Sequence, residues 1–202
     1  MEQPGTDILS GRSADATRAS DERLLSAFLE GDETMFSALV HRYEQPLHAF
    51  ICRVTGEPAD AADLFQETFV RVYQKAGTFR SDSSLKTWLY SIAVNLCRSQ
   101  MRKRRGELHV PIEAGRGVAV HSRPGPNGLE AEEIGSRVAA AVKRLPLEQR
   151  EVFVLRVYDE MTYGDISAAL ERPLGTVKSQ MRSALAKLRG DLRDIARAYG
   201  VA

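Results

Sequence analysis

Residues 60–105 read DAADLFQETFVRVYQKAGTFRSDSSLKTWLYSIAVNLCRSQMRKRR, and this stretch decides the fold. Apolar residues recur every three or four positions on both sides of a polar turn, which predicts two neighbouring helices. The charge changes sign along the way. Acids come early, at Asp60, Asp63 and Glu67, and the stretch ends in four consecutive basic residues, 102–105. An acidic face beside a basic face indicates surfaces for unlike partners.

The charge of the whole chain is distributed just as unevenly. Residues 21–70 hold ten acids and three bases, net −7, whereas residues 71–105 hold one acid and nine bases, net +8. Because the full 202 residues carry only +1, the asymmetry is local. Runs of one sign usually line solvated helix faces, but so strong a basic excess in a short segment favours a nucleic-acid surface.

Composition favours a cytoplasmic protein without membrane insertion. Hydrophobic residues make up 43% of the chain, enough to build packed cores. No apolar run approaches the roughly 18 residues that span a bilayer, and residues 1–20 lack the apolar segment of a secretory signal. Two cysteines in helical patterns, Cys52 and Cys97, indicate no disulfide framework.

The periodicity of the rest of the chain predicts an all-α fold of two small helical domains joined by a flexible linker. Residues 1–20 are polar and aperiodic, which predicts a disordered tail. One helical domain is expected over 21–105 and another over 130–195. Residues 106–129 between them are rich in Gly and Pro, and a structureless segment of this length marks a domain boundary.

Single residues mark the expected helix boundaries of the first domain. Asp32 is expected to cap the helix that follows it, and Pro46 to kink or split that helix. Gly77 is expected to end the helix that starts near residue 60. Either Asp82 or Ser83 is expected to cap the helix that follows.

The C-terminal residues 162–189 have the pattern of a helix-turn-helix. Thr162 and Asp165 resemble a capping box, and a tight turn containing Gly175 separates two short amphipathic helices. The second helix is expected to bury Val177, Met181, Leu185 and Leu188. Lysine, arginine and serine side chains would then point outward, where they suit phosphates and base edges in a major groove. An ordinary antiparallel helix pair would give a similar pattern.

The basic helix before residue 105 suits single-stranded nucleic acid. Such strands are bound by a basic track with aromatic or polar groups that receive bases. Asn95 lies one turn from Arg98 on the polar face, and its amide can bond a base edge. Phe79 and Trp88 are near that face in sequence, although Trp88 falls on the apolar stripe and would suit the core equally well.

The acidic helix cannot bind DNA through its carboxylates, since they repel phosphates. Asp60 and Asp63 lie near a helix N-terminus, where the macrodipole alone favours acids. Glu67 lies more than two turns in, so that explanation does not cover it. This face is expected to meet solvent or a basic protein partner.

Three segments of the chain resemble, in order and spacing, the extracytoplasmic-function (ECF) group of the sigma-70 family of bacterial RNA polymerase sigma factors. DAADLFQETFVRVYQ (60–74) resembles the helix that binds core polymerase. FRSDSSLKTWLYSIAVNLCRSQMRKRR (79–105) resembles the segment that melts and recognises the −10 element. Residues 145–189 resemble the domain that reads the −35 element. The resemblance implies a region 2 bundle, a linker and a region 4 helix-turn-helix.

The resemblance also implies partners and residue roles. The partners are core RNA polymerase (its β′ coiled coil and β flap), promoter DNA as −35 duplex and −10 single strand, and an anti-sigma factor. The polymerase-binding residues implied by the resemblance are Asp63, Gln66, Glu67 and Arg71. Asp60, the first acid of the same face, is expected to join them. The −10 residues would be Phe79, Arg80, Ser81, Asp82, Ser83, Ser84, Trp88, Asn95, Arg98 and Arg102. The −35 residues would be Thr176, Lys178, Ser179, Arg182, Ser183 and Lys187. Members of the family often have Arg where this chain has Gln180.

The alternatives to this function are an enzyme and a stand-alone regulator. An enzyme would need a phosphate loop, a nucleophile elbow or paired acids in an apolar pocket, and the sequence has none of these. His48 and Cys52 are spaced as a possible pair of metal ligands, but two ligands do not make a site, so neither a metal nor a cofactor is expected. A stand-alone helix-turn-helix regulator remains open, and it would bind duplex DNA without polymerase.

Overall fold

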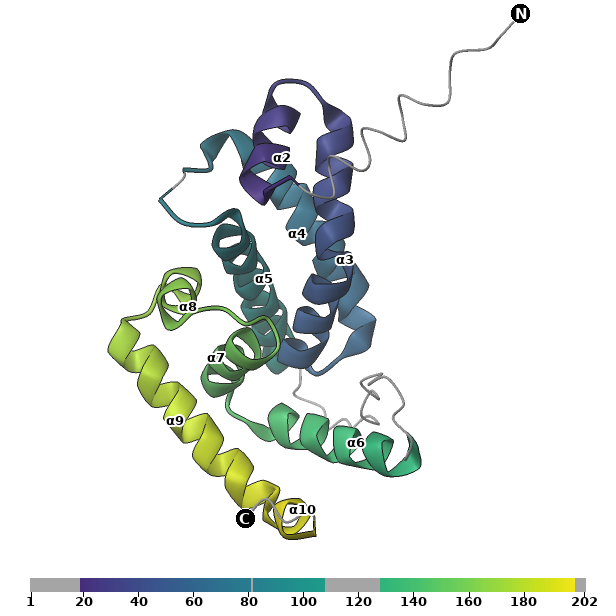
Figure 1. Cartoon of the computed structure of the whole chain (residues 1–202), viewed down its shortest axis with the longest axis vertical. Helices are drawn as coiled ribbons and strands as arrows, with labels where there is room; N and C mark the ends of the chain where they lie inside the picture. The colour runs from purple at the N-terminus through teal and green to yellow at the C-terminus, as the bar shows by residue number, and fades with distance from the viewer. Residues whose placement is uncertain (1–18, 81, 108–127, 199–202) are drawn as a thin grey trace, which may run out of the picture.

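Every regular element in the described part of this computed structural model is a helix (Figure 1). The structure describes residues 19–80, 82–107 and 128–198. The N-terminal bundle consists of α2 (Asp21–Leu29), α3 (Glu33–Thr55), α4 (Ala61–Lys75) and α5 (Leu85–Glu107). The C-terminal bundle consists of α6 (Gly128–Arg144), α7 (Leu147–Val157), α8 (Tyr163–Leu170), α9 (Leu174–Asp191) and α10 (Arg193–Ala198). The all-α prediction is confirmed.

The ends of the predicted linker, 106–129, are helical. α5 continues to Glu107 and α6 begins at Gly128, so the helices extend into it from both sides. Its middle, like nearly all of the predicted disordered tail 1–20, lies outside the described residues. Ser20, the last residue of the predicted tail, is the N-cap of α2. Its hydroxyl accepts a hydrogen bond from the Arg23 N–H at 3.3 Å.

The N-terminal bundle is built around α3, the central helix, which contacts α2, α4 and α5. Leu39, Leu47, Phe50 and Ile51 are completely buried in its interior. Pro46 does not split α3, because the apolar contacts on both sides of the proline hold one continuous helix over 23 residues. Of the two outcomes expected at Pro46, a kink or a split, the split is therefore wrong.

The end of α4 differs from the predicted glycine stop. Gly77 does not adopt a left-handed conformation; it lies in a 3-10 turn, Ala76–Thr78, that tightens the end of the helix. The Thr78 hydroxyl donates to the Lys75 carbonyl at 2.7 Å and satisfies one of the free acceptors there. A left-handed glycine does end a helix in this bundle, but it is Gly56, after α3.

The cap of α5 is Ser84, not Asp82 or Ser83. The Ser84 hydroxyl accepts from the Thr87 N–H at 3.2 Å, and its carbonyl accepts from the Trp88 N–H. A second free N–H, that of Leu85, donates to the Glu22 carboxylate of α2 at 3.0 Å. That hydrogen bond lowers the pKa of Glu22 below its ordinary value. The start of α5 is thus held both by its own cap and by another helix.

We expect Ser84→Ala to lower the free energy of unfolding by about 1 kcal/mol, the usual contribution of a serine N-cap. Ser83→Ala is the matched control, because Ser83 makes no capping contact in the structure and should change stability by less than about 0.5 kcal/mol. Urea denaturation followed by circular dichroism compares the two. Equal losses would contradict the assignment of the cap.

The C-terminal bundle contains the helix-turn-helix, formed by α8 and α9. Thr162 caps α8 by accepting from the Asp165 N–H at 3.1 Å, as the sequence indicated. The chain reverses at Glu171, which is left-handed with φ +52°, while Gly175 already lies inside α9. The turn predicted over 171–175 therefore begins where expected but is two residues shorter, because Leu174 and Gly175 belong to α9.

The buried face of α9 is rotated slightly from the predicted one. Its buried residues are Val177, Met181, Ala184 and Leu188. Leu185 is 44% exposed, contrary to the prediction, because Ala184 takes its place at the helical spacing. The opposite face of α9 is consequently free for polar side chains.

The two bundles are in contact with each other. α8 packs on α5, and α7 packs on α3, so that helices from both ends of the chain share one interior (Figure 1). In the figure α7 and α8 lie beside α5, and α9 runs along the outer side of α7. The sequence predicted two bundles, but nothing in its local patterns predicted that they meet.

Candidate nucleic-acid interface

The outward face of α9 presents a row of polar side chains. The helix begins after Pro173, whose carbonyl accepts from the N–H groups of Thr176 and Val177. All six residues predicted for −35 DNA are exposed: Thr176, Lys178, Ser179, Arg182, Ser183 and Lys187. A helix with lysine, arginine and serine on one open face has the chemistry for phosphates and base edges in a major groove.

Gln180 stands where the family often has Arg, and its side chain forms hydrogen bonds within the C-terminal bundle. Its side-chain oxygen accepts from Arg172 at 3.1 Å, and its amide donates to the Glu148 carboxylate at 2.9 Å. Both ends of the amide are therefore occupied. The side chains of α9 that remain open to a ligand are those on its exposed face.

The acidic face of α4 is largely open. Asp63, Gln66 and Glu67 are exposed, and Glu67 forms an ion pair with Arg71 at 2.8 Å. Two apolar side chains on the same helix, Val70 and Tyr73, are also about half exposed. Charged and apolar groups together on an open helix are suited to a protein partner.

Asp60 differs from the other acids of this face. Its carboxylate accepts from the Arg104 guanidinium at 2.8 Å, and its side chain is only 13% exposed. Because Arg104 belongs to the basic end of α5, the first acid of the stretch is paired with one of its last bases. The structure thus places Asp60 in an internal ion pair and not on the open acidic face.

The loop between α4 and α5 carries the first group of predicted −10 residues. Arg80, Asp82 and Ser84 are exposed and Ser83 is half-buried, while Ser81 lies outside the described residues. Phe79 packs against Trp88, with ring centroids 5.4 Å apart. Trp88 is only partly buried, so the two rings sit at the boundary between core and surface.

Some side chains on the polar face of α5 are exposed, and one is paired with the C-terminal bundle. Asn95 and Arg102 are exposed, as predicted. Arg98 is instead held by Glu151 of α7, with Nε at 2.8 Å from Oε1 and Nη2 at 2.9 Å from Oε2. This bidentate hydrogen bond raises the pKa of Arg98 above its ordinary value. The expectation that Arg98 lies on an open basic face is therefore wrong for this conformation.

Glu151 is the acceptor at the centre of this contact and was missed by the sequence analysis. It is completely buried, and a second arginine, Arg172 of the C-terminal bundle, lies 3.1 Å from its Oε2. A buried carboxylate needs such partners to remain charged. The sequence did carry a signal, since Glu151 interrupts the apolar run of α7 on its buried side.

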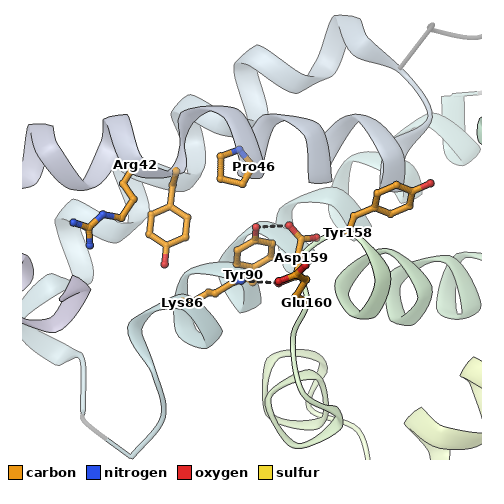
Figure 2. Close-up of a pocket in the computed structure, with 8 residues that line it drawn as sticks. Arg42, Pro46, Lys86, Tyr90, Tyr158, Asp159 and Glu160 are labelled. Carbon is orange, nitrogen blue, oxygen red and sulfur yellow. Dashed lines mark hydrogen bonds between the residues drawn. The ribbon is translucent and has the colours of Figure 1, made fainter. Parts of the chain in front are cut away.

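A second polar contact between the bundles involves Asp159, which follows α7. Tyr90 of α5 donates to its Oδ1 at 2.6 Å, and Lys86 donates to its backbone carbonyl at 2.6 Å (Figure 2). Burial raises the pKa of Asp159 to about 6, against the opposing effect of the Tyr90 hydrogen bond. Burial and the Asp159 charge likewise raise the pKa of Tyr90.

A cavity of about 290 Å³ opens next to Asp159 at the boundary between the bundles. Residues of α3, α5 and the loop after α7 line it, among them Arg42, Lys86 and Glu160 (Figure 2). The other oxygen of Asp159, Oδ2, is buried and has no hydrogen-bond partner among the described residues. One of the two oxygens of this carboxylate is therefore buried without a hydrogen bond, which disfavours its charged form.

Neither thiol is arranged for reactivity. Cys52 lies 3.7 Å from His48 Nδ1, the spacing noted in the sequence, and partial burial raises its pKa. Burial raises the pKa of Cys97 to about 12, with a further contribution from Glu151. No group of three metal-ligating side chains occurs within the described ranges. None of the helices described here is both long and apolar enough to cross a membrane.

Comparison with known proteins agrees with the division into two bundles. The family described as Sigma-70 region 2 matches residues 39–107, which cover most of α3 through α5. The family described as Sigma-70, region 4 matches residues 136–188, from within α6 to near the end of α9. The two matches follow one another in the order predicted.

Similar whole proteins and structures are also found. The ECF RNA polymerase sigma-E factor of Salmonella typhimurium is 32% identical over 170 residues, 80% of this chain and 88% of that protein. The sigma factor RpoE of Bartonella quintana, solved in complex with the anti-sigma factor NepR, matches with a TM-score of 0.61 and 32% identity, covering 73% of this chain and 89% of that one. CnrH, solved with the cytosolic domain of CnrY, matches with a TM-score of 0.65 and 25% identity, covering 87% and 99%.

Proposed function

Since this chain belongs to the extracytoplasmic-function group of the sigma-70 family of RNA polymerase sigma factors, we propose which of its surfaces carry out each step of promoter-directed initiation. The exposed part of the acidic face of α4 docks on core polymerase. The outward face of α9 reads the −35 duplex. The loop before α5 and the exposed part of α5 hold the melted −10 strand. The chain performs no covalent chemistry itself and acts in the cytoplasm, where polymerase and promoter meet.

The observation that carries this proposal most directly is the open face of α9. Its six predicted −35 residues are all exposed, while Val177, Met181 and Ala184 between them are buried and hold the helix in place. Lys178, Arg182 and Lys187 neutralise phosphates or donate to guanine, and the serines bond phosphates or bases. A duplex can reach this helix without any rearrangement of the C-terminal bundle.

Docking on polymerase is assigned to Asp63, Gln66, Glu67 and Arg71, with Val70 and Tyr73 as apolar contacts beside them. The exposed carboxylates suit a basic protein surface, and two half-exposed apolar side chains give that contact a desolvated centre. Asp60 is left out of this docking surface, because its carboxylate is already paired with Arg104.

Strand capture is assigned to the Phe79–Trp88 ring pair and to Asn95. A base that has left the duplex needs a stacking surface and a hydrogen-bonding partner for its edge. The two rings lie between the core and the surface. Asn95 is exposed, about two helical turns before the exposed Arg102. Binding of the single strand then favours the melted promoter over the closed duplex.

Regulation by an anti-sigma factor is part of the proposal. Its support is that the sigma factor RpoE of Bartonella quintana, to which this chain is similar along most of its length, was solved bound to an anti-sigma factor. The acidic face of α4 is the surface where a competitor would block polymerase docking directly.

Run-off transcription with purified core polymerase tests the proposed function. Fragments of the genome of the source bacterium serve as templates, and start sites are mapped from the transcripts. We expect defined start sites only when this protein is added. Tight binding to duplex promoter DNA without polymerase, and no stimulation of transcription with it, would instead identify a stand-alone regulator.

We expect Asn95→Ala to lose discrimination among −10 sequences by about tenfold, since one good contact to a base contributes about 1–3 kcal/mol of specificity. Total affinity for an average promoter should fall much less. Transcription from a set of −10 variants measures this, with Ser99→Ala on the same helix as the control. A uniform loss on all promoter variants would contradict the assignment of Asn95 to base reading.

A further inference from the structure

Glu22 of α2 holds the start of α5, although 63 positions separate it from Leu85. Its carboxylate accepts a hydrogen bond from the Leu85 N–H at 3.0 Å. We propose that Glu22 is a positioning residue for strand capture, which fixes the first turn of α5 and thereby the ring pair of Phe79 and Trp88. This inference rests on the proposed function, in which that ring pair receives a melted base.

The helix that carries Glu22 lies outside the matched family segment. Sigma-70 region 2 matches residues 39–107, whereas α2 comprises Asp21–Leu29. The match therefore includes α5 but not the residue that holds its start. The role of Glu22 has to be argued from the contacts of α2 with α3 and α5.

The first turn of α5 has more free N–H groups than its own cap can satisfy. The Ser84 hydroxyl accepts from the Thr87 N–H at 3.2 Å. The N–H of Leu85, the first residue of the helix, has no acceptor within the helix itself. Glu22 supplies an acceptor from another helix, and its charge also lies at the positive end of the α5 dipole. The Leu85 N–H is the main cause of the lowered pKa of Glu22, so the carboxylate is charged at neutral pH.

Trp88 belongs to the turn that Glu22 holds. Its N–H donates to the Ser84 carbonyl at 3.2 Å, and the Phe79 ring packs on its indole with ring centroids 5.4 Å apart. A shift of this first turn therefore moves the indole and the ring that rests on it. Because stacking requires a fixed surface, such a shift weakens the capture of a base.

α2 is itself firmly attached, so that Glu22 acts as a fixed point. Asp21, the preceding residue, accepts from the Arg42 guanidinium at 2.5 Å and from the Tyr43 hydroxyl, both of α3. Two leucines of α2 are buried in the bundle. The two adjacent acids thus connect α2 to α3 on one side and to α5 on the other. The start of α5 is placed relative to the central helix of the bundle.

The remainder of α5 does not depend on Glu22. At its far end Arg104 donates to Asp60 at 2.8 Å, and Ala93 in its middle is completely buried. Loss of Glu22 is therefore expected to loosen the first turn, while the rest of the helix and the exposed Asn95 keep their place. Since Glu22 is itself exposed, its role can be separated from folding.

The first test uses Trp88 as its own probe, since it is the sole tryptophan of the 202 residues. Intrinsic fluorescence and acrylamide quenching of the free full-length protein report how far the indole is exposed. We expect Glu22→Ala to shift the emission to the red and to increase quenching. Glu22→Gln should keep the original emission, because its amide oxygen still accepts from the Leu85 N–H. Unchanged emission in Glu22→Ala would overturn the proposal.

Glu33→Ala is the matched control, since Glu33 is likewise an exposed acid in the first turn of a helix, α3. It should leave the emission of Trp88 unchanged, and an equal red shift would mean that the loss of any such acid is enough. The midpoint of thermal unfolding should fall by less than about 4 °C in every variant. A much larger fall for Glu22→Ala would make Glu22 a residue of the fold and refute the positioning role.

The second test measures strand capture by the holoenzyme. The probe is a fluorescent single-stranded oligonucleotide with the non-template −10 sequence of a promoter mapped by run-off transcription. We expect Glu22→Ala to weaken its binding about tenfold, the usual contribution of one stacked base, and Glu22→Gln to restore it. Binding of core polymerase should be equal for all variants, because the docking surface is assigned to α4.

The outcomes separate this inference from the proposed function. If the unaltered holoenzyme did not bind the oligonucleotide and gave no transcripts, the proposed function would fail, and strand capture with it. If the unaltered holoenzyme bound the oligonucleotide and Glu22→Ala bound it equally well, only the role of Glu22 would be refuted.

Discussion

Glu151→Ala is expected to lower the free energy of unfolding by about 3–5 kcal/mol, because it removes one partner from a buried charge cluster. Glu151 is completely buried and accepts from Arg98 and Arg172, whose side chains are only 22% and 18% exposed. Without the carboxylate, two largely desolvated guanidinium groups face each other at the junction of α5, α7 and α8. The folded state would lose the attraction of both arginines to Glu151, and their side chains would no longer be held in one position.

Glu148→Ala is the matched control for this prediction. Glu148 stands three positions earlier in the same helix and also contacts Arg172, at 3.9 Å, but its side chain is 65% exposed. Surface pairs of this kind contribute about 0–1 kcal/mol. Urea denaturation of both variants, followed by circular dichroism, measures the difference. Similar losses for the two glutamates would show that the burial of Glu151 has no energetic consequence.

Glu67→Lys is expected to weaken the binding of core polymerase about 100-fold while leaving the fold intact. The exposed Glu67 would be replaced by a cation that meets a basic partner surface, and like charges at an interface cost several kcal/mol. The substitution also puts a lysine next to Arg71, which now loses its 2.8 Å ion pair, but both side chains are about half exposed and can separate in water.

Glu44→Lys is the control for this charge reversal, since Glu44 is an exposed acid on α3, away from the acidic face of α4. Both variants change the net charge equally, so general electrostatic effects should cancel in the comparison. Co-purification with core polymerase and fluorescence titration of the complex measure the affinity. Normal assembly of the Glu67→Lys protein with core would refute the docking surface proposed on α4.

Local signals in the sequence predicted most of the fold because they act over a few residues. Asp32 and Thr162 cap the helices that follow them, as a side-chain oxygen near free N–H groups should. The cap of α5 and the buried face of α9 were predicted wrongly because two adjacent residues could each have filled the same position. Ser83 and Ser84 are both plausible caps, and only the position of the Thr87 N–H decides between them. Ala184 and Leu185 compete similarly for the core, and the rotation of α9 against α7 decides.

The parts of the candidate site that lie on a single helix were predictable from the sequence. The contacts between distant helices were not. The exposed face of α9 and the exposed carboxylates of α4 follow from helical spacing alone. The pairing of Arg98 with Glu151 joins residues 53 positions apart across the Gly- and Pro-rich segment, and no periodicity reports such a contact. Asp60 with Arg104 is a similar case, with 44 positions between the partners. Long-range ion pairs require the arrangement of the helices in space.

The burial of Cys97 has a consequence for how the protein responds to oxidants. Hydrogen peroxide and disulfides react with the thiolate, and a thiol whose pKa is raised to about 12 is almost entirely protonated at neutral pH. Cys52, half-buried and also with a raised pKa, is only a little better placed. Both sulfurs should therefore oxidise more slowly than free cysteine. Neither cysteine is therefore well placed to act as a fast sensor of oxidants.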